Sequence, residues 1–340
     1  MPALAVADAL RADGCEVVFV GGERAERELV PAAGYELRTI SVEGISRSNP
    51  LKAARAVGKA VGGVFAARRI LAELRPDVVM GGGGYVAGTV GAAAASKRIP
   101  LVLTEADSHL GISNRALARF ARRVCLAFPI EGREGEKYLV TGRPVPPPAT
   151  DLAAARARFG IAEGETVVLV FGGSLGARSI NTAALEAFAT PPADGVRVLH
   201  AAGARDYDRL TAPGAHYDLR PYIDRFGEAL LVADLVVARS GGSVFEVAAH
   251  GKPAILVPYP HAAADHQTAN ARWMERGGAA VVVADGELDA ARLSAEVGAL
   301  LADRERLERM AQASAALARP DAARAIADEL LAAAGRPAAA

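Results

Sequence analysis

The chain has 340 residues, 51% of them hydrophobic and 23% charged, so it can bury a large core and is long enough for two domains. Lysine plus arginine equals aspartate plus glutamate at 39 each, and this balance provides no net attraction for nucleic acid. We therefore expect a folded protein without a nucleic-acid partner.

The pattern of apolar residues contains neither a membrane span nor a secretion signal. The Ala/Val-rich segments are broken by charges before they reach the roughly 18 apolar residues of a membrane span. No basic region followed by an apolar core marks a secretion signal. Cys15 and Cys125 each lie in an apolar, strand-like run. We therefore expect each to be a small buried hydrophobic residue and not part of a disulfide or a metal site. These features predict a cytoplasmic protein, at most peripheral to a membrane.

The first expected element is a helix. Pro2 precedes apolar residues at helical spacing as far as Leu10, and Gly14 provides a stop. A doubly wound domain normally opens with a central strand whose turn carries phosphate-facing glycines. We therefore expect a gap in the middle of the first sheet, and we expect that the start of the chain was assigned too late.

Short β-branched runs then alternate with Ala/Leu/Arg-rich stretches at helical spacing, which indicates βαβ units and mostly parallel sheets. The proline-rich run 143–148 cannot continue a helix and reads as an interdomain linker. We expect a first domain at 1–145, a second at 146–319, and a terminal helix at 320–340 that returns to the first. The expected strands are 15–20, 35–40, 77–80, 101–104, 124–128 and 138–141, then 166–171, 196–200, 219–223, 235–238, 254–257 and 279–283.

Three glycine turns each join an expected strand to an expected helix, at 81–84, 171–177 and 239–246. Exposed amides at a helix N-terminus can receive an anion, although a glycine turn can equally serve packing alone. In the third turn, Ser243 and Glu246 have the spacing of a capping box, and Glu246 is alternatively a carboxylate for a ribose.

Polar side chains follow two other strands, where open α/β sheets bind ligands. One loop carries Asp265, His266 and Gln267 and reads as a ligand loop or as a solvated helix start. The other carries Glu105 and Asp107, which can support general-base chemistry or simply lie on a surface loop.

Taken in order, these pieces resemble the glycosyltransferases that add N-acetylglucosamine to lipid I, the MurG family. The resemblance covers nearly the whole chain. It implies the GT-B class, an α/β fold with two Rossmann-like domains facing across a cleft. Its most specific motifs are GGYVAG at 83–88, ISNRALARFA at 112–121, FGGSLGAR at 171–178 and PYPHAAADHQTANA at 258–271.

The resemblance implies that UDP-N-acetylglucosamine binds mainly to the second domain. By similarity, Ser174 contacts the phosphates, Ile223 the uracil, Glu246 the ribose and Gln267 the sugar. The remaining donor-binding residues it implies are Gly173, Gly241, Gly242, Ser243 and His266.

The implied acceptor is lipid I, an undecaprenyl-diphosphate-linked muramoyl peptide at the inner face of the plasma membrane. Its sugar 4-hydroxyl attacks with inversion, without a metal or other cofactor, in peptidoglycan synthesis. The helix at 51–74 mixes apolar and basic residues, which suits contact with anionic lipid or an ordinary helix on the sheet. The loop expected to meet the acceptor diphosphate comprises Gly82, Gly83, Gly84, Tyr85 and Asp107.

The chain departs from the family pattern in several places. A histidine that the family carries in its first glycine turn would precede Pro2, which leaves the catalytic base unassigned, with Glu105 and Asp107 as candidates. The family's His-Glu-Gln-Asn motif reads Thr-Glu-Ala-Asp at 104–107, Pro146 replaces an arginine, and the loop before Glu246 is about one residue short. Alternative hypotheses are a related GT-B transferase with another acceptor, a non-hydrolysing sugar-nucleotide epimerase, and an inactive donor-binding homologue.

Overall fold

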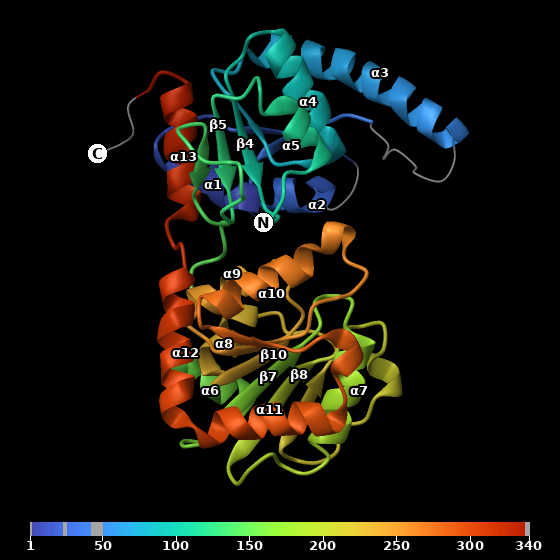
Figure 1. Cartoon of the computed structure of the whole chain (residues 1–340). Coiled ribbons are helices and arrows are strands. Elements are labelled where there is room, and N and C mark those ends of the chain that lie inside the picture. Colours follow the sequence, from blue (N-terminus) through green and yellow to red (C-terminus); the bar gives the residue numbers. More distant parts are fainter. Residues whose placement is uncertain (1, 23–25, 42–49, 337–340) are drawn as a thin grey trace. The chain divides into compact units, whose positions relative to one another are not determined.

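The computed structural model describes residues 2–22, 26–41 and 50–336, with the side chains of 50–61 and 263 outside the description (Figure 1). The chain folds into two compact units. The first comprises Met1–Val145 together with Arg319–Ala340, and the second comprises Pro146–Ala318.

The strands of the first unit are divided between two parallel sheets, which is the interruption that the sequence predicted. The first described strand begins at Val18, so Cys15 precedes it instead of lying inside it as expected. One sheet pairs β1 (Val18–Gly21) with β2 (Glu36–Thr39), and the other has the order β3 (Val79–Gly81), β4 (Leu101–Glu105), β5 (Arg123–Leu126), β6 (Tyr138–Val140).

The last helix of the chain, α13 (Ala322–Ala333), belongs to the first unit and lies beside α1 (Pro2–Ala12) (Figure 1). Val6, Ile326 and Leu330 share a buried cluster, and Arg324 pairs with Asp13 at 2.6 Å. The prediction that the terminal helix returns to the first domain is confirmed. The other helices of this unit are α2 (Glu26–Ala32), α3 (Pro50–Leu74), α4 (Gly84–Ser96) and α5 (Ile112–Leu117).

The second unit is built on one six-stranded parallel sheet, ordered β12-β11-β10-β7-β8-β9. Numbered within the unit this is 6-5-4-1-2-3, the order of doubly wound dinucleotide-binding folds, in which ligands bind where the order reverses. That point lies between β7 and β10. The strands are β7 (Thr166–Phe171), β8 (Val196–Ala201), β9 (Tyr217–Arg220), β10 (Leu235–Ala238), β11 (Ala254–Leu256) and β12 (Ala280–Val282).

Helices cover both faces of this sheet, so its central strands are apolar on both sides. All of the residues of β10 and β11 are buried. The helices are α6 (Leu152–Phe159), α7 (Arg178–Ala187), α8 (Phe226–Val232), α9 (Val244–Ala249), α10 (His266–Arg276), α11 (Ala290–Ala302) and α12 (Arg304–Leu317). Among the helices described, none combines the length and the apolar character needed to cross a bilayer.

Candidate functional site

Three of the loops singled out in the sequence begin at one edge of the second sheet. In the strand register Phe171 pairs with Ala238, and Ala238 pairs with Leu256. The parallel strands β7, β10 and β11 therefore end side by side, at the point where the strand order reverses. This places the turn at Gly173 and Ser174, the turn at Gly241–Ser243, and the loop leading to Gln267 along the same edge.

The turn after β7 is shaped by backbone contacts that only glycine permits. Gly173 and Gly176 have φ values of 89° and 76°. A Cβ on Gly176 would collide with the carbonyl oxygen of Ala202, and one on Gly203 would collide with the backbone of Gly176. The two backbones thus pack directly together, while the tip with Gly173 and Ser174 is exposed just ahead of α7. Such a turn presents amides and a hydroxyl to an anion.

A buried polar chain supports this turn from beneath. The Nδ2 of Asn181 donates to the Ala202 carbonyl at 2.9 Å, and its Oδ1 lies 3.1 Å from His200 Nε2. The His200 Nδ1 lies 2.7 Å from the Tyr217 hydroxyl. Burial lowers the pKa of His200 to about 4, so the neutral ring donates from Nε2 to Asn181 and accepts from Tyr217. The sequence interpretation missed all three residues.

Arg239, directly after β10, joins several of the site's segments. Its side chain is 10% exposed and pairs with Asp285 at 2.6 Å. It also donates to the carbonyls of Val257 and Pro258 at 3.1 and 3.2 Å, and to the Ser179 hydroxyl at 2.8 Å. The guanidinium therefore ties the beginning of α7 and the loop after β11 to the end of β10.

The turn that follows Arg239 does not form the capping box. Ser243 occupies the N-cap position of α9 but makes no side-chain cap hydrogen bond. Its φ of −64° and ψ of −15° are helical, whereas an N-cap residue needs an extended backbone for its oxygen to turn back onto the helix. The capping interpretation of Ser243 and Glu246 was therefore wrong. The half-buried Glu246 lies in the first turn of α9.

Gln267 lies beside this turn. A Cβ on Gly241 would be 3.9 Å from the Gln267 side-chain nitrogen. The Gln267 Oε1 accepts from the Tyr259 amide at 3.0 Å, and its backbone carbonyl accepts from Ser240 Oγ at 2.7 Å. These bonds leave the side-chain nitrogen as the donor facing the glycine turn. His266 is half-buried at the first position of α10.

Ile223 follows β9, two strands away from β7, and is 4% exposed. The helix that starts after it returns toward the switch point, since the Phe226 ring packs edge-on against Phe171 at 4.9 Å. The structure thus connects the predicted uracil segment to the end of β7.

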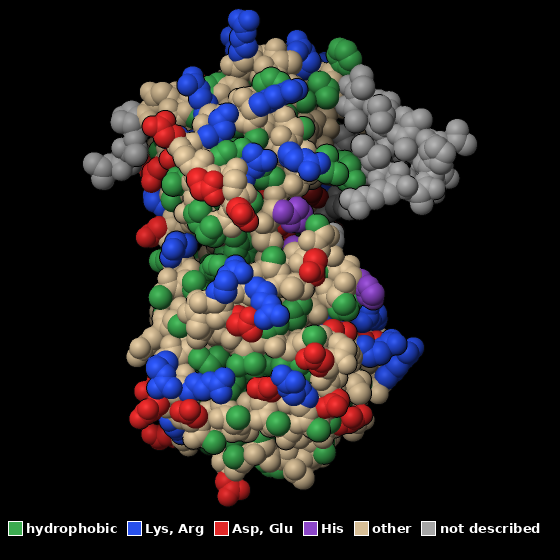
Figure 2. Space-filling model, viewed as in Figure 1, with side chains coloured by type: hydrophobic (Ala, Val, Ile, Leu, Met, Phe, Trp, Pro, Cys, Tyr) green, Lys and Arg blue, Asp and Glu red, His purple; other side chains and the backbone are tan. Residues whose placement is uncertain are grey.

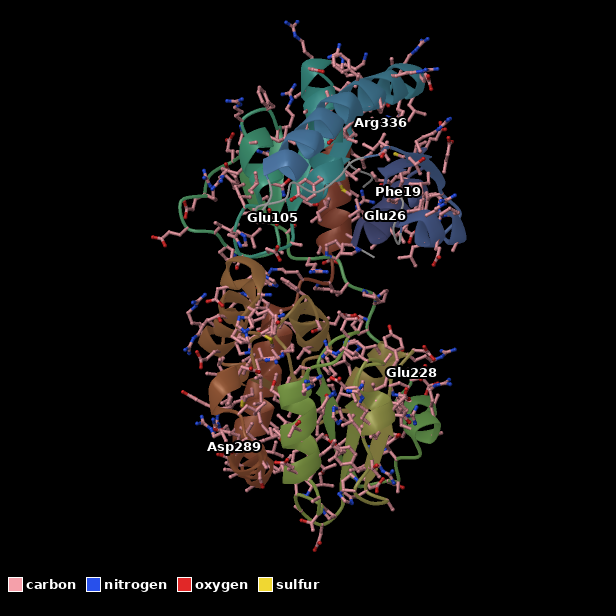
Figure 3. All side chains as sticks on the ribbon, turned by 90° about the vertical axis from the view of Figure 1, so that its right-hand side faces the viewer. Phe19, Glu26, Glu105, Glu228, Asp289 and Arg336 are labelled. Atoms are coloured by element: carbon pink, nitrogen blue, oxygen red, sulfur yellow. The ribbon has the colours of Figure 1, made fainter. Side chains whose placement is uncertain are left out.

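In the first unit, Glu105 at the end of β4 organises the loop that follows it (Figure 3). Its carboxylate accepts from the amides of Asp107 and Gly111 at 3.2 and 2.8 Å, and from Asn114 Nδ2 at 2.9 Å. These contacts assign Glu105 to holding the loop. Asn114 is 1% exposed and was missed as a separate residue, although it lies inside the ISNRALARFA motif.

The glycine run after β3 lies next to this loop. Gly83 has a φ of 81° and precedes α4, and Ser113 Oγ donates to the Gly84 carbonyl at 2.8 Å. Tyr85 is 53% exposed and Asp107 is half-buried. The structure therefore gathers Gly82–Tyr85 and Asp107 around the beginnings of α4 and α5.

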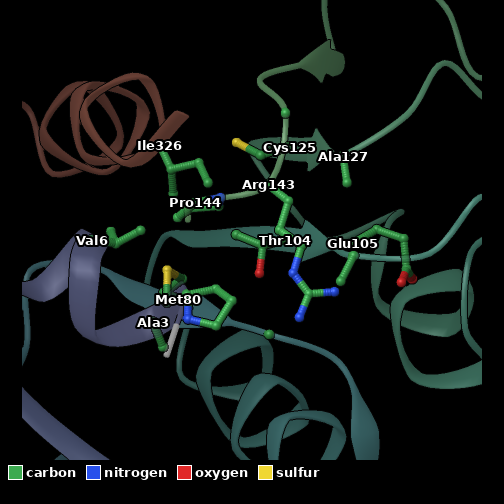
Figure 4. Close-up of a pocket in the computed structure, with 14 residues that line it drawn as sticks. Ala3, Val6, Met80, Thr104, Glu105, Cys125, Ala127, Arg143, Pro144 and Ile326 are labelled. Atoms are coloured by element: carbon green, nitrogen blue, oxygen red, sulfur yellow. The ribbon is translucent and has the colours of Figure 1, made fainter. Parts of the chain in front are cut away.

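A cavity of about 310 Å³ opens at the ends of β3, β4 and β5 (Figure 4). Gly82 and Glu105 line it, together with Thr104, Cys125 and Arg143, while Asp107 does not. Burial raises the pKa of Cys125 to about 12, so its thiol stays protonated. Over the described residues, no three His, Cys, Asp or Glu side chains are grouped so that they could hold a metal ion.

Comparison with known proteins agrees with this architecture. Residues 1–126 match the Glycosyltransferase family 28 N-terminal domain, and residues 167–326 match the Glycosyltransferase family 28 C-terminal domain. The structure of Acinetobacter baumannii MurG is similar over 97% of this chain and 95% of that one, with a TM-score of 0.78 and 29% identity. A UDP-GlcNAc 2-epimerase from Neisseria meningitidis covers 97% of this chain and 96% of its own at a TM-score of 0.69, but its 14% identity shows the fold alone.

Other relatives share a higher sequence identity with this chain. The UDP-N-acetylglucosamine--N-acetylmuramyl-(pentapeptide) pyrophosphoryl-undecaprenol N-acetylglucosamine transferase of Moorella thermoacetica is 41% identical over 97% of this chain and 94% of its own length. The protein of the same name from Rubrobacter xylanophilus is 40% identical over 96% of this chain and 98% of its own. The chain therefore belongs to glycosyltransferase family 28, among the MurG transferases, and is a hexosyltransferase of two parallel-sheet α/β domains.

Proposed function

We propose that this protein transfers N-acetylglucosamine from UDP-N-acetylglucosamine to lipid I, forming lipid II in peptidoglycan synthesis. The observation that carries the proposal is the 41% identity to the Moorella thermoacetica transferase over 97% of the chain. The placement of the predicted donor residues along the switch-point edge supports it.

The donor lies at the second unit in this proposal. Ser174 and the amides around Gly173 hold the diphosphate ahead of α7, whose positive end favours negative charge. Glu246 accepts hydrogen bonds from the ribose hydroxyls, and Gln267 donates to the sugar. Ile223 lies against the uracil. Gly241, Gly242 and Ser243 let the nucleotide approach the backbone, and His266 completes the sugar contacts.

The acceptor meets the first unit, with its diphosphate near Gly82, Gly83, Gly84 and Tyr85. Its 4-hydroxyl attacks the anomeric carbon, the bond to UDP breaks, and the configuration inverts. Amide dipoles rather than a metal ion stabilise the departing diphosphate. Of the two candidate bases, Asp107 supports the role better, because its carboxylate has no hydrogen-bond partner among the described residues while Glu105 is engaged.

The transfer itself is tested with purified protein, UDP-N-acetylglucosamine and a lipid I analogue. We expect UDP release that depends on the lipid, together with a product that carries the added sugar. UDP release that does not depend on the lipid would contradict the cell-wall role. Interconversion of the donor sugar without transfer would identify an epimerase.

Replacing Glu246 by glutamine should weaken UDP binding by roughly 10- to 100-fold, because a hydrogen bond to a charged group contributes about 1.5–3 kcal/mol. Calorimetric titration with UDP measures this effect. Dideoxy-UDP, which lacks both ribose hydroxyls, should bind the variant and the wild type alike. Equal losses with the two nucleotides would contradict the ribose contact.

We also propose that the first unit rests on anionic lipid at the inner face of the plasma membrane. Phe65, Ile112 and Phe120 are 68, 68 and 53% exposed. Exposed Arg69 lies one turn from Phe65, and the Arg119 guanidinium lies over the Phe120 ring. Figure 2 shows Lys and Arg side chains among apolar ones on the surface of this unit. Such a mixture suits an interface with acidic headgroups.

The helix expected to make this contact is only partly described. Val64, Ile70 and Leu71 pack against the core of the first unit, as an ordinary covering helix would. Phe65 is the large hydrophobic side chain that is exposed in the described part of α3. Other apolar and basic residues of the helix expected at 51–74 have side chains outside the description, namely Lys52, Arg55, Val57, Lys59 and Val61.

Co-sedimentation with anionic vesicles tests the membrane proposal. The double variant with Phe65→Ser and Phe120→Ser should bind fewer vesicles than the wild type. We expect the affinity to fall roughly tenfold for each ring removed, since a fully buried Phe contributes about 1.5–3 kcal/mol. Leu152→Ser, at an exposed leucine on α6 of the second unit, is the matched control. Binding that is unchanged in the double variant, or lost equally in the control, argues against this surface.

A further inference from the structure

Arg143 lines the cavity of the first unit, and its backbone is fixed on both sides. Gly142 before it has a φ of 81°, and a Cβ there would collide with the Arg319 side chain. The amide of Gly142 donates to the Leu126 carbonyl at 3.2 Å. Pro144 follows Arg143 and restricts the backbone of Arg143 further. The chain path therefore directs the Arg143 side chain into the cavity (Figure 4).

The Arg143 guanidinium has no counter-ion among the residues that the structure describes. Within the described part of the chain, Arg143 forms no ion pair or side-chain hydrogen bond. Arg143 is half-buried and lines the cavity. Glu105, the carboxylate that also lines the cavity, already accepts from Asp107, Gly111 and Asn114. A half-buried cation without a partner is unfavourable. The cavity is therefore arranged to favour an anion.

The lining suits a phosphate group. A guanidinium fork binds phosphate oxygens in a bidentate fashion. In Figure 4 the Arg143 guanidinium lies between the side chains of Thr104 and Glu105. The single proton of the Thr104 hydroxyl makes a long hydrogen bond of 3.5 Å to the Gly81 carbonyl and can turn to a phosphate oxygen instead. Gly82, the first residue of the proposed acceptor loop, lines the same cavity. Its volume of about 310 Å³ leaves room for a diphosphate.

We propose that Arg143 binds the diphosphate of the acceptor lipid. The assignment to the acceptor rests on the proposed function, whereas the binding of a diphosphate by this cavity does not. Arg143 thereby adds a fixed cation to a loop otherwise made of glycine amides, and it contributes to acceptor affinity rather than to donor affinity.

The first arm of the test measures binding of inorganic pyrophosphate to the full chain by calorimetry, with saturating UDP present to occupy the donor site. Arg143→Gln should weaken this binding tenfold or more, and Arg143→Lys should weaken it less, because a point charge replaces the fork. Arg27→Gln is the control, at an exposed arginine on α2 away from the cavity. The wild-type affinity should fall as salt is added.

The second arm measures initial rates with a lipid I analogue. Arg143→Gln should raise the KM for the lipid tenfold or more and leave the KM for UDP-N-acetylglucosamine unchanged. A wild type that does not bind pyrophosphate, or an Arg143→Gln variant that binds it as tightly as wild type, overturns the proposal. A raised KM for the nucleotide alone overturns it too, because the guanidinium would then serve the donor.

The two arms separate this proposal from the proposed function. If the wild type glycosylates no lipid, the function fails, while pyrophosphate binding still decides the role of Arg143. Thermal unfolding of each variant shows whether it is folded. If Arg143→Gln does not fold, Arg143→Lys decides, since pyrophosphate affinity equal to that of wild type would again count against a bidentate contact.

Discussion

Gly176→Ala should destabilise the second unit by about 3 kcal/mol or more and abolish detectable UDP binding. The new Cβ would collide with the Ala202 carbonyl oxygen and lie 3.2 Å from the Gly203 Cα. These are backbone atoms, and Ala202 is held in turn by Asn181. The φ of 76° adds the strain of a left-handed conformation to this overlap. Urea unfolding and titration with UDP measure the two effects.

Gly173→Ala is the matched control for this prediction. Gly173 lies in the same turn with a φ of 89°, but a Cβ there would have no atom within 4 Å. Gly173→Ala should lower the free energy of unfolding by only about 1–2 kcal/mol, because it adds backbone strain alone. Equal losses of stability in the two variants would show that direct packing of the Gly176 and Gly203 backbones does not matter.

Arg239→Met should lower the free energy of unfolding by about 3–5 kcal/mol, the range for removing one member of a buried ion pair. The change leaves Asp285 without its cation, and it removes the donors to the carbonyls of Val257 and Pro258. Because these groups belong to the loops around the switch point, UDP affinity should fall as well. Urea unfolding and calorimetry check the two results.

Two further variants separate this network from a general effect of losing arginine. Arg292→Met removes a surface pair with Glu296 and should cost less than about 1 kcal/mol. Adding Asp285→Asn to Arg239→Met should recover part of the loss, because no uncompensated carboxylate then remains. A loss at Arg239 no larger than at Arg292 would contradict the role of the buried guanidinium.

The relatives of this chain favour a transferase over an epimerase. The epimerase similarity extends over 97% of the chain but at 14% identity, so it reflects the shared fold. The relatives at about 40% identity are transferases. The lipid-dependent assay distinguishes transfer to lipid I from transfer to another acceptor and from loss of activity, because an inactive homologue binds UDP without turnover.

The sequence by itself determined the order of elements, the parallel sheets and the positions of the glycine turns. These features are local, since β-branched runs, helical spacing and glycine each act within a few residues. The strand expected at 166–171 is β7 residue for residue, and the opening helix from Pro2 is α1. The division of the first unit's strands between two sheets agrees with the expected gap.

Only the tertiary structure decided which side chains meet. Asn181 contacts His200 because β7 and β8 are neighbours, and Arg239 reaches Ser179 because β10 lies beside β7. Asp285 follows β12 on the other side of β10, yet it meets both Arg239 and Ser179. These partners are many residues apart, and no local signal encodes their contact. The capping box failed for a related reason. The spacing of Ser243 and Glu246 fitted the motif, but the surrounding fold gave Ser243 a helical backbone from which its oxygen makes no cap hydrogen bond.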